Sequence, residues 1–312
     1  MRMQHVLSLT CCLLIFVPVS QAQQNPFQGF DFGKFKFDPK MPFQVDDLSD
    51  QFMIQLLGKP GVDQKELQGI QVSIADERKV GEHQFQMYRR YLDSQQVKLV
   101  SQGRDVVYLR QLVARLQPLM QNARRYPQIQ VYVANASTTD ARAFPGGRVV
   151  VFRGLLNFVE NEAALVGLLG HELSHIDRQH QLEQLKNARL AETKLKNPTV
   201  NANKFFHVGQ LMMKSFMTPF GFKQEQQADL DGARWCFQLG YDPLEMAQVF
   251  RRLHEQDRNR QVPLPGFLRS HPYHIDRFRS IQDERIRRVK ANPEKELVIG
   301  RGHLKRRQPS PR

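Results

Sequence analysis

The sequence predicts a mainly helical α+β domain with a small β-sheet. Two observations indicate this class. Apolar residues recur at helical spacing along most of the chain, whereas only two short segments have the character of strands. The chain has 312 residues, 41% of them hydrophobic and 24% charged, which suits one core of ordinary size but hardly two large ones.

The first residues have the composition of an export signal. Residues 1–22 contain an early arginine, a short apolar run and small residues near the end, so we expect a secretory signal peptide cut after Ala22. A signal anchor is the alternative, but the apolar run 6–19 is short for a span of about 20 residues. A lipoprotein signal is disfavoured because Cys11 and Cys12 lie inside that run.

Residues 23–61 are interpreted as a Phe-rich flexible leader, in which the aromatic residues are spaced among Gly, Pro, Lys and Asp without a helical period. Phe30, Phe32, Phe35 and Phe37 partly alternate, which is compatible with a strand added on contact with a partner or with the domain's own edge. A linker with incidental aromatics explains the same pattern equally well.

The folded domain is expected over residues 62–288 and begins with helices. Helices are expected at 63–80, 82–101 and 105–120, and strands at 129–134 and 149–152. The two strands are expected to be joined through the turn Pro145-Gly146-Gly147, because glycine permits the positive φ angles of such turns.

His171, Glu172 and His175 stand in the sequence His-Glu-Leu-Ser-His. The preceding residues are rich in Ala and Leu, and Asn161 or Asn157 can cap the start of a helix there. On a helix the two imidazoles, four residues apart, lie on one face and can bind one ion at about 2.0 to 2.1 Å. Glu172 lies about 100° around the helix from His171. It is therefore a poor third ligand but a suitable general base for a water beside the ion.

A second helical stretch, 223–239, supplies the missing ligand. Glu225 can complete a His2Glu site with an open fourth position, which is the catalytic pattern rather than the closed structural one. Asp229, one turn further on, can accept a hydrogen bond from the ring N–H of a ligand histidine and so fix its tautomer. Alone, the histidine motif could arise by chance and the acidic pair could be a solvated helix face. Together they predict one Zn²⁺ per chain, although Fe and Mn accept similar ligands.

These motifs resemble the M48 family of gluzincin metallopeptidases, and especially its bacterial periplasmic members. Four blocks carry the resemblance: Asp-Ala-Arg-Ala-Phe-Pro-Gly-Gly at 140–147 with the strand after it, the His171 motif, Glu-Gln-Gln-Ala-Asp at 225–229, and Ser-His-Pro-Tyr-His-Ile-Asp-Arg at 270–277. The likeness spans roughly residues 76–288 and implies a zincin-like metalloprotease domain, α+β and mainly α, with a small β-sheet beside the active-site helix.

The resemblance also implies how the substrate binds. In such a domain the strand beside the metal helix receives the substrate as an added antiparallel strand. The residues expected to bind substrate are Gly146, Gly147, Arg148 and Val149. The two glycines could equally form no more than a hairpin turn. Asp140 and Arg142 stand where the family usually has Asn and an aromatic residue, so a substrate preference is not carried over.

His271 and Arg277 are expected, by resemblance, to approach the active site. A cationic or hydrogen-bonding group there would stabilise the oxyanion of a tetrahedral intermediate. His271, on a loop before a proline, could instead occupy the fourth metal position and keep the enzyme idle. By contrast, His180, His254 and His274 are interpreted as surface or helix-face residues.

Between the two metal motifs lies a long excursion. Residues 179–196 are charged and helical in pattern, and residues 205–222 are rich in Met and aromatics. We interpret the second stretch as a core or rim helix, with a lid or a membrane-touching hairpin as the alternative. Cys236, beside Trp235, is interpreted as a small apolar core residue rather than a reactive thiol.

The formal net charge of +14 and the pI near 9.9 indicate an anionic partner. Much of the charge lies in residues 285–312, and residues 289–312 are expected to form a basic disordered tail. An exported protein meets anionic phospholipid, lipopolysaccharide or cell-wall polymer far more readily than nucleic acid. We therefore expect association with an anionic membrane or cell-wall surface and no nucleic-acid binding.

The sequence thus predicts a zinc metalloendopeptidase exported to the periplasm, with peripheral membrane association left open. By resemblance, its substrates are unfolded or misassembled envelope proteins. The competing interpretation is a chaperone-like outer-membrane assembly factor that binds clients in the same cleft and cleaves them rarely. A third interpretation, a structural zinc site, predicts a site without an exchangeable water.

Overall fold

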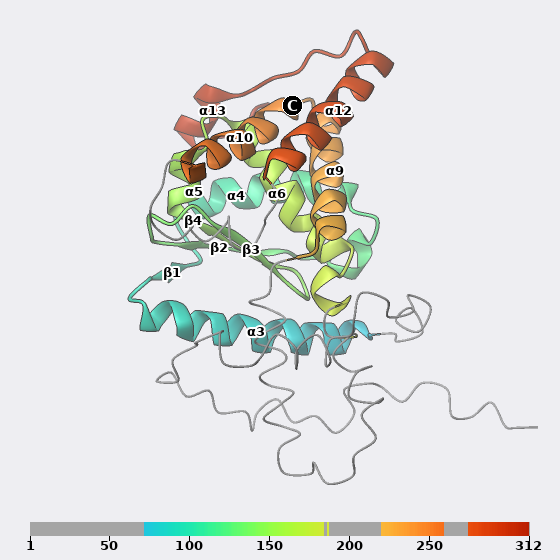
Figure 1. Cartoon of the computed structure of the whole chain (residues 1–312). Coiled ribbons are helices and arrows are strands. Elements are labelled where there is room, and N and C mark those ends of the chain that lie inside the picture. The colour runs from blue at the N-terminus through green and yellow to red at the C-terminus, as the bar shows by residue number, and fades with distance from the viewer. Residues whose placement is uncertain (1–71, 184–185, 187–219, 259–273, 312) are drawn as a thin grey trace, which may run out of the picture.

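The computed structural model describes residues 72–183, 186, 220–258 and 274–311 (Figure 1). The elements, in chain order, are α3 (Ile74–Ser94), β1 (Leu99–Val100), α4 (Arg104–Leu116), β2 (Gln130–Ala134), β3 (Ala141–Phe144), β4 (Arg148–Phe152), α5 (Arg153–Phe158), α6 (Glu162–Asp177), α9 (Phe222–Gln238), α10 (Leu244–Arg258), α12 (His274–Ala291) and α13 (Arg301–Arg306), with short 3₁₀ turns at Gln117–Leu119 and Ala123–Arg125. This content confirms the predicted mainly helical α+β class.

The sheet is small and mixed, with the order β1-β2-β4-β3. β2 and β4 run parallel, while β1 and β3 pair antiparallel to their neighbours. The predicted turn through Gly146 therefore joins β3 to β4, and not the two strands expected from the sequence. β3 was found by the resemblance to a strand-turn-strand block, but the residue pattern had missed it because β3 is only four residues long.

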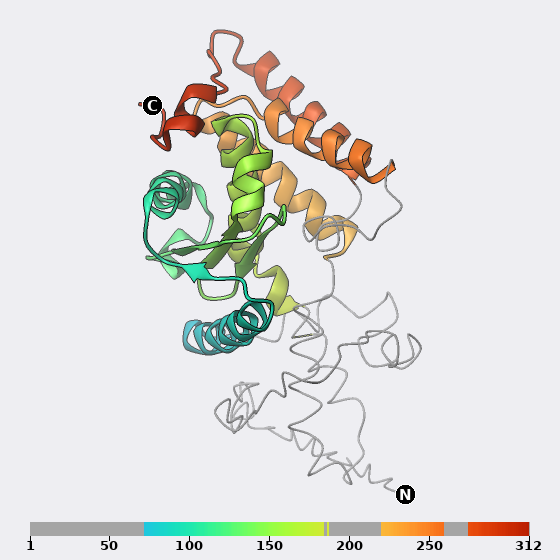
Figure 2. The ribbon, with the colours of Figure 1, turned by 90° about the vertical axis from the view of Figure 1, so that its left-hand side faces the viewer.

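Helices cover both faces of the sheet (Figures 1 and 2). Because side chains alternate along a strand, Val149 and Val151 face the core shared with α4 and α6, whereas Val150 faces Phe85 and Tyr88 of α3. Both faces of β4 are thus buried, as expected for an inner strand covered on two sides. The sheet separates the single helix α3 from the larger helical part of the domain.

α3 is one continuous helix, although the sequence had suggested two helices with a break at Gly81. Ser73 caps its start by accepting a hydrogen bond from the Asp76 N–H at 3.1 Å. A Cβ on Gly81 would lie 1.7 Å from the carbonyl oxygen of Pro145 in the β3–β4 turn. Gly81 is therefore present for close approach between helix and turn, and not to end a helix.

α6 is buried along its whole length, from Glu162 to Asp177. Such a helix is apolar on nearly every side because it packs against neighbours all round. Asn161 caps its start, since its Oδ1 accepts from the Ala164 N–H at 2.9 Å. The predicted helix and one of its two proposed caps are thereby confirmed, and the His171 motif lies on the central helix of the domain.

The end of the chain differs from the disordered basic tail expected over 289–312. α13 inserts Leu304, 4% exposed, into the main core. The Ser310 N–H donates to the buried Glu162 carboxylate at 2.8 Å, and Arg307 pairs with Asp105 at 2.7 Å. The expectation was wrong because Leu304 packs into the core and polar groups of the segment bind the carboxylates of Glu162 and Asp105.

Several expectations fall outside the described residues. These are the signal peptide and the Phe-rich leader, nearly all of the excursion between 184 and 219, and His271. Among the helices that the structure describes, none combines the length and the apolar character needed to cross a membrane.

Candidate metal centre

Two helices, α6 and α9, cross closely enough to bring their polar side chains together inside the core. At the crossing, a Cβ on Gly232 would lie 2.7 Å from the Gly167 carbonyl oxygen and 2.9 Å from the His171 nitrogen, and a Cβ on Gly170 would lie 3.0 Å from the Gly232 Cα. Only glycine fits such an approach without displacing backbone. The crossing therefore places Glu225, on α9, against the His171 motif on α6.

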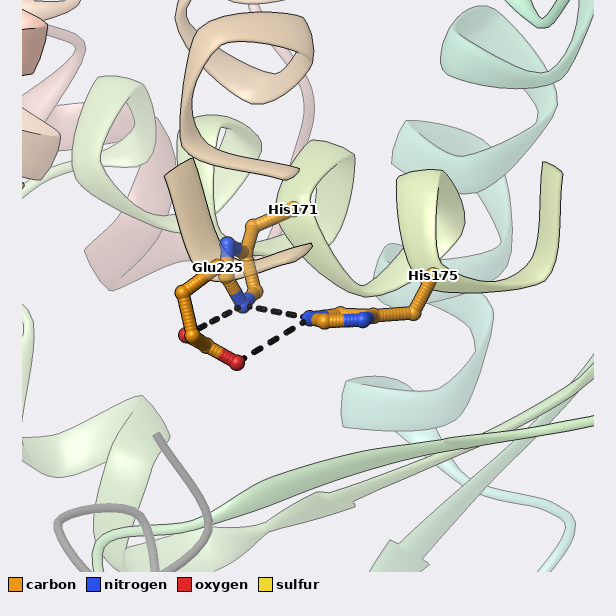
Figure 3. Close-up of side chains that lie close together, drawn as sticks. All are labelled: His171, His175 and Glu225. Atoms are coloured by element: carbon orange, nitrogen blue, oxygen red, sulfur yellow. Dashed lines mark hydrogen bonds and ion pairs between the residues drawn. The ribbon is translucent and has the colours of Figure 1, made fainter. Parts of the chain in front are cut away.

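His171, His175 and Glu225 converge on one point (Figure 3). The two Nε2 atoms are 3.0 Å apart, and the Glu225 carboxylate oxygens lie 3.6 Å from His171 Nε2 and 3.5 Å from His175 Nε2. Ligand atoms at about 2.1 Å from a tetrahedral ion are about 3.4 Å from one another. All three side chains are fully buried, and their spacing fits one small divalent cation.

The hydrogen bonds of the two imidazoles support this assignment. His171 Nδ1 lies 2.9 Å from Asp229 Oδ1, and His175 Nδ1 lies 2.9 Å from His180 Nδ1. Because a carboxylate only accepts, His171 donates from Nδ1 and its Nε2 is left as a lone pair. If His175 is likewise protonated on Nδ1, two lone pairs face each other at 3.0 Å. A cation shared by both nitrogens accounts for that arrangement.

Arg277, on α12, contacts both carboxylates of the cluster. Its Nη1 lies 2.8 Å from Glu225, and its Nε and Nη2 donate to the two oxygens of Asp229 at 2.7 Å each. Burial raises the pKa of the Glu225 carboxyl well above its ordinary value, while Arg277 acts in the opposite direction. A bound cation would also favour the ionised carboxylate. Arg277 thus lies beside the two acidic side chains, with its Nη2 also 3.2 Å from His171 Nδ1, while the oxyanion role expected for it stays a prediction.

Glu172 is not one of the three converging side chains, but it is buried on the same helix, at 1% exposed. Its carboxylate interacts electrostatically with the guanidinium groups of Arg142 and Arg277. Arg142 also pairs with Asp140 at 3.4 Å and lies over the Tyr88 ring. The two positions where the chain departs from the usual family pattern therefore lie close to the predicted general base.

The substrate-binding residues expected from the sequence need correction. Val149 is fully buried on β4, whose two edges are taken by β2 and β3. Gly146 N–H donates to Glu77 at 3.1 Å, Gly147 carbonyl accepts from Gln130, and Arg148 pairs with Glu82. The Gly146 N–H, the Gly147 carbonyl and the Arg148 side chain therefore already have partners within the domain. In the described sheet the edge strands are β1 and β3, and β3 is the one that packs against α6, so a strand added beside α6 would pair with β3 and not with β4.

His180 was interpreted as a surface or helix-face residue, and this was wrong. It is 2% exposed and lies against His175, with its Nε2 3.3 Å from Gln227 Oε1. Burial lowers its pKa to about 4, so the ring is neutral near pH 7. Five residues after His175, a continuous helix would have placed it on another face, which is why the pattern gave no signal.

Comparison with known proteins agrees with this geometry. The sequence profile described as Peptidase family M48 matches residues 108–285, which is more than half of the chain. The chain belongs to peptidase family M48. The matched region contains β2 to β4, the His171 motif, the third ligand and most of α12.

Individual relatives are more distant. A protein named mitochondrial metalloendopeptidase OMA1 from Arabidopsis thaliana is 27% identical over 157 residues, 46% of this chain and 29% of the relative. The β-barrel assembly-enhancing protease of Yersinia pestis is 27% identical over 183 residues, covering 55% and 37%. Its counterpart in Escherichia coli K12 is 27% identical over 152 residues, covering 45% and 31%. The matches thus cover well under half of each relative. The family and these names agree with the predicted enzyme class, a metalloendopeptidase.

Proposed function

We propose that this M48 member is a zinc-dependent endopeptidase of the cell envelope that hydrolyses peptide bonds in unfolded or misassembled proteins. The observation that carries the proposal is the convergence of His171, His175 and Glu225, with the ligand atoms within 4.8 Å of one another. Two imidazole nitrogens and one carboxylate form the donor set typical of catalytic zinc. Fe or Mn would accept the same donors, so the choice of zinc is part of the proposal.

The chemistry divides between the metal and the side chain of Glu172. When bound, the zinc would polarise the scissile carbonyl and make water a stronger nucleophile near neutral pH. Glu172 would take the proton of the attacking water and pass it to the leaving nitrogen. Its position supports this role, because Glu172 is buried on α6, next to the ligand His171, and is not one of the converging ligands.

The edge of β3 that faces away from β4 supports a particular mode of peptide binding. Asp140 carbonyl accepts from the Phe152 N–H at 2.9 Å, so by antiparallel alternation Ala141 and Ala143 direct their backbone groups away from β4. The Ala143 carbonyl accepts from Gln181 Nε2 at 3.0 Å. We propose that a substrate strand pairs here and replaces the Gln181 contact, since β-strand addition requires these same groups.

Digestion of an unfolded protein such as casein tests the peptidase assignment. The wild-type protein loaded with Zn²⁺ should cleave, and removal of the metal with a chelator should abolish cleavage. Glu172→Gln should lower the rate by about 10² to 10⁴ while stoichiometric zinc is retained. Glu294→Gln, at an exposed position after α12, is the matched control and should cleave normally. Normal cleavage by Glu172→Gln would refute the assigned role.

The proposed localisation and substrates are supported by the sequence and by the names of relatives, and not by the geometry of the metal site. The export-signal pattern of residues 1–22 favours the periplasm, and the relatives from Yersinia pestis and Escherichia coli carry the name β-barrel assembly-enhancing protease. These names also favour the second candidate, an assembly factor that binds envelope proteins and cleaves them rarely. Cells lacking the protein should be complemented by wild type but not by Glu172→Gln if cleavage is essential. Full complementation by Glu172→Gln would favour the assembly role.

The positive charge of the chain supports contact with an anionic surface of the envelope. With a net charge of +14, the protein should bind vesicles containing an anionic phospholipid, and binding should weaken as salt rises. Neutral vesicles are the control. A fusion of residues 1–30 to a reporter that is active only after export tests the proposed localisation, and an inactive fusion would contradict it.

A further inference from the structure

We propose that His180 is a positioning residue for the metal site, which fixes the tautomer and the ring orientation of the ligand His175. The inference rests on the metal site of the proposed function but not on peptidase activity. His180 lies outside the three ligands and outside the predicted catalytic residues. It is buried, at 2% exposed, and its ring is directed to the ring of His175.

The contact joins the non-ligating nitrogen of His175 to His180. The two Nδ1 atoms are 2.9 Å apart, and the ring planes meet at 72° with centroids 4.9 Å apart. His175 Nε2 is the atom directed to His171 and Glu225. The same imidazole therefore uses one nitrogen toward the cation position and the other toward His180, which is the arrangement by which a partner orients a metal ligand.

The direction of each proton follows from the chemistry of the ligand. A neutral histidine that binds a cation through Nε2 carries its proton on Nδ1, so His175 must donate to His180. His180 Nδ1 then accepts, and its own proton is on Nε2. That nitrogen lies 3.3 Å from Gln227 Oε1, an acceptor. The non-ligating N–H of His175 and the N–H of His180 each meet an acceptor, and the chain ends on α9, the helix that also carries Glu225.

The backbone after α6 is shaped to bring His180 back toward His175. Along a regular helix, residues five apart are offset by about 140° and do not face each other. Here the helix ends at Asp177, Gln179 has a positive φ of 58°, and the Leu182 N–H donates to the Gln179 carbonyl at 2.9 Å. A left-handed residue other than glycine is uncommon. It interrupts the helical path directly before His180, whose ring lies against that of His175.

Phe220 holds the other side of the same ring. It stacks on His175 with centroids 4.0 Å apart and an interplanar angle of 20°. Stacking restricts rotation out of the plane, while the contact with His180 restricts rotation within it. The two ligand histidines thus have different partners: Asp229, a carboxylate, for His171, and a neutral imidazole for His175.

Zinc affinity of two His180 variants tests the proposal. His180→Asn keeps an acceptor near the place of Nδ1, and His180→Leu removes it. Competition between each protein and a chromophoric chelator for Zn²⁺ should show a loss of about 10- to 100-fold for His180→Leu. His180→Asn should stay within about threefold of wild type. His254→Leu and His254→Asn, on α10 and partly exposed, are the matched controls and should bind zinc as wild type does.

The tautomer of His175 is a second measurement. A residue that only filled space beside His175 would not determine it. In ¹⁵N-histidine-labelled, metal-free protein, His175 should carry its proton on Nδ1 in wild type and in His180→Asn. In His180→Leu a mixture of tautomers should appear. Gln227→Leu is a second variant that leaves all three imidazoles in place. By allowing His180 to turn its proton to Nδ1, it should weaken zinc binding by about 2- to 10-fold.

The outcomes separate this inference from the proposed function. Equal zinc affinity of His180→Leu and wild type would overturn the positioning role and leave the peptidase proposal intact. Equal losses in His180→Asn and His180→Leu would show that the volume of the imidazole matters, and not its acceptor, which also overturns it. Absence of stoichiometric zinc in the wild-type protein would overturn the proposed function itself.

Discussion

Arg277 donates to both oxygens of the Asp229 carboxylate, from Nε to Oδ2 and from Nη2 to Oδ1, at 2.7 Å each. Such a bidentate pair fixes the carboxylate in one plane. Asp229 in turn accepts from His171 Nδ1, and the third guanidinium nitrogen reaches Glu225. All these groups are buried. One cation from α12 therefore compensates two carboxylates on α9 and orients a ligand on α6.

Replacement of Arg277 tests how far the buried carboxylates depend on it. Arg277→Leu leaves Asp229 and Glu225 buried without their cation, so the free energy of unfolding of metal-free protein should fall by about 3 to 5 kcal/mol. Arg277→Lys keeps the charge but loses the planar fork, and its loss should be intermediate. Urea denaturation in the presence of a chelator measures both. An unchanged midpoint for Arg277→Leu would contradict this account.

The left-handed residue Gln179 gives a second prediction. Glycine adopts a φ of 58° without steric cost, so Gln179→Gly should keep or slightly raise stability. A β-branched residue is strained there, and Gln179→Val should be less stable than Gln179→Gly by about 1 to 2 kcal/mol. Thermal or urea unfolding of the two variants provides the comparison. Equal stability would show that the turn after α6 does not depend on this conformation.

The two candidate histidine ligands could be predicted because their spacing is local. His171 and His175 lie one turn apart on a helix whose composition and Asn161 cap are readable from the sequence. Glu225 is far from them in the chain, but its own helix and the acidic residue at position 229 could be recognised. What the sequence did not show was how closely the helices approach, which depends on Gly170 and Gly232 at the crossing.

The errors have a common physical cause, which is contact between segments distant in sequence. Gly81 looked like a helix breaker, yet it fits against the Pro145 carbonyl inside a continuous α3. Val149 was expected to bind substrate, yet β3 lies between β4 and the edge of the sheet. His180 looked exposed on a regular helix, and a single positive φ at Gln179 turned it inward. None of these contacts has a periodic signature.

Cys236 gives a third prediction, on the reactivity of its thiol. Burial raises the pKa of its thiol well above the ordinary value, and the side chain is fully buried. In a variant with Cys11 and Cys12 replaced by Ser, a thiol reagent should react with native protein at least about 100-fold more slowly than with urea-unfolded protein. Rapid labelling of native protein at pH 7 would contradict the burial.

The same thiol should also lower stability in alkali. The unfolded state releases the proton above about pH 8.5, whereas the folded state keeps it, so the unfolded state binds fewer protons and stability falls as pH rises past that value. Cys236→Ala should remove this part of the pH dependence. The free energy of unfolding of both proteins, measured between pH 7 and pH 10, makes the comparison.

The last helix of the chain gives a fourth prediction, because Leu304 and Lys305 are neighbours with opposite environments. Leu304 is 4% exposed and belongs to the main core, whereas Lys305 is exposed. Leu304→Ala should therefore lower the free energy of unfolding by about 2 to 4 kcal/mol, through lost burial and an incompletely filled cavity. Lys305→Ala should change it by less than about 0.5 kcal/mol. A disordered tail would give no change for either variant. Since α13 leads to the Ser310 contact with Glu162 at the start of α6, Leu304→Ala should also increase amide hydrogen exchange in the first turn of that helix.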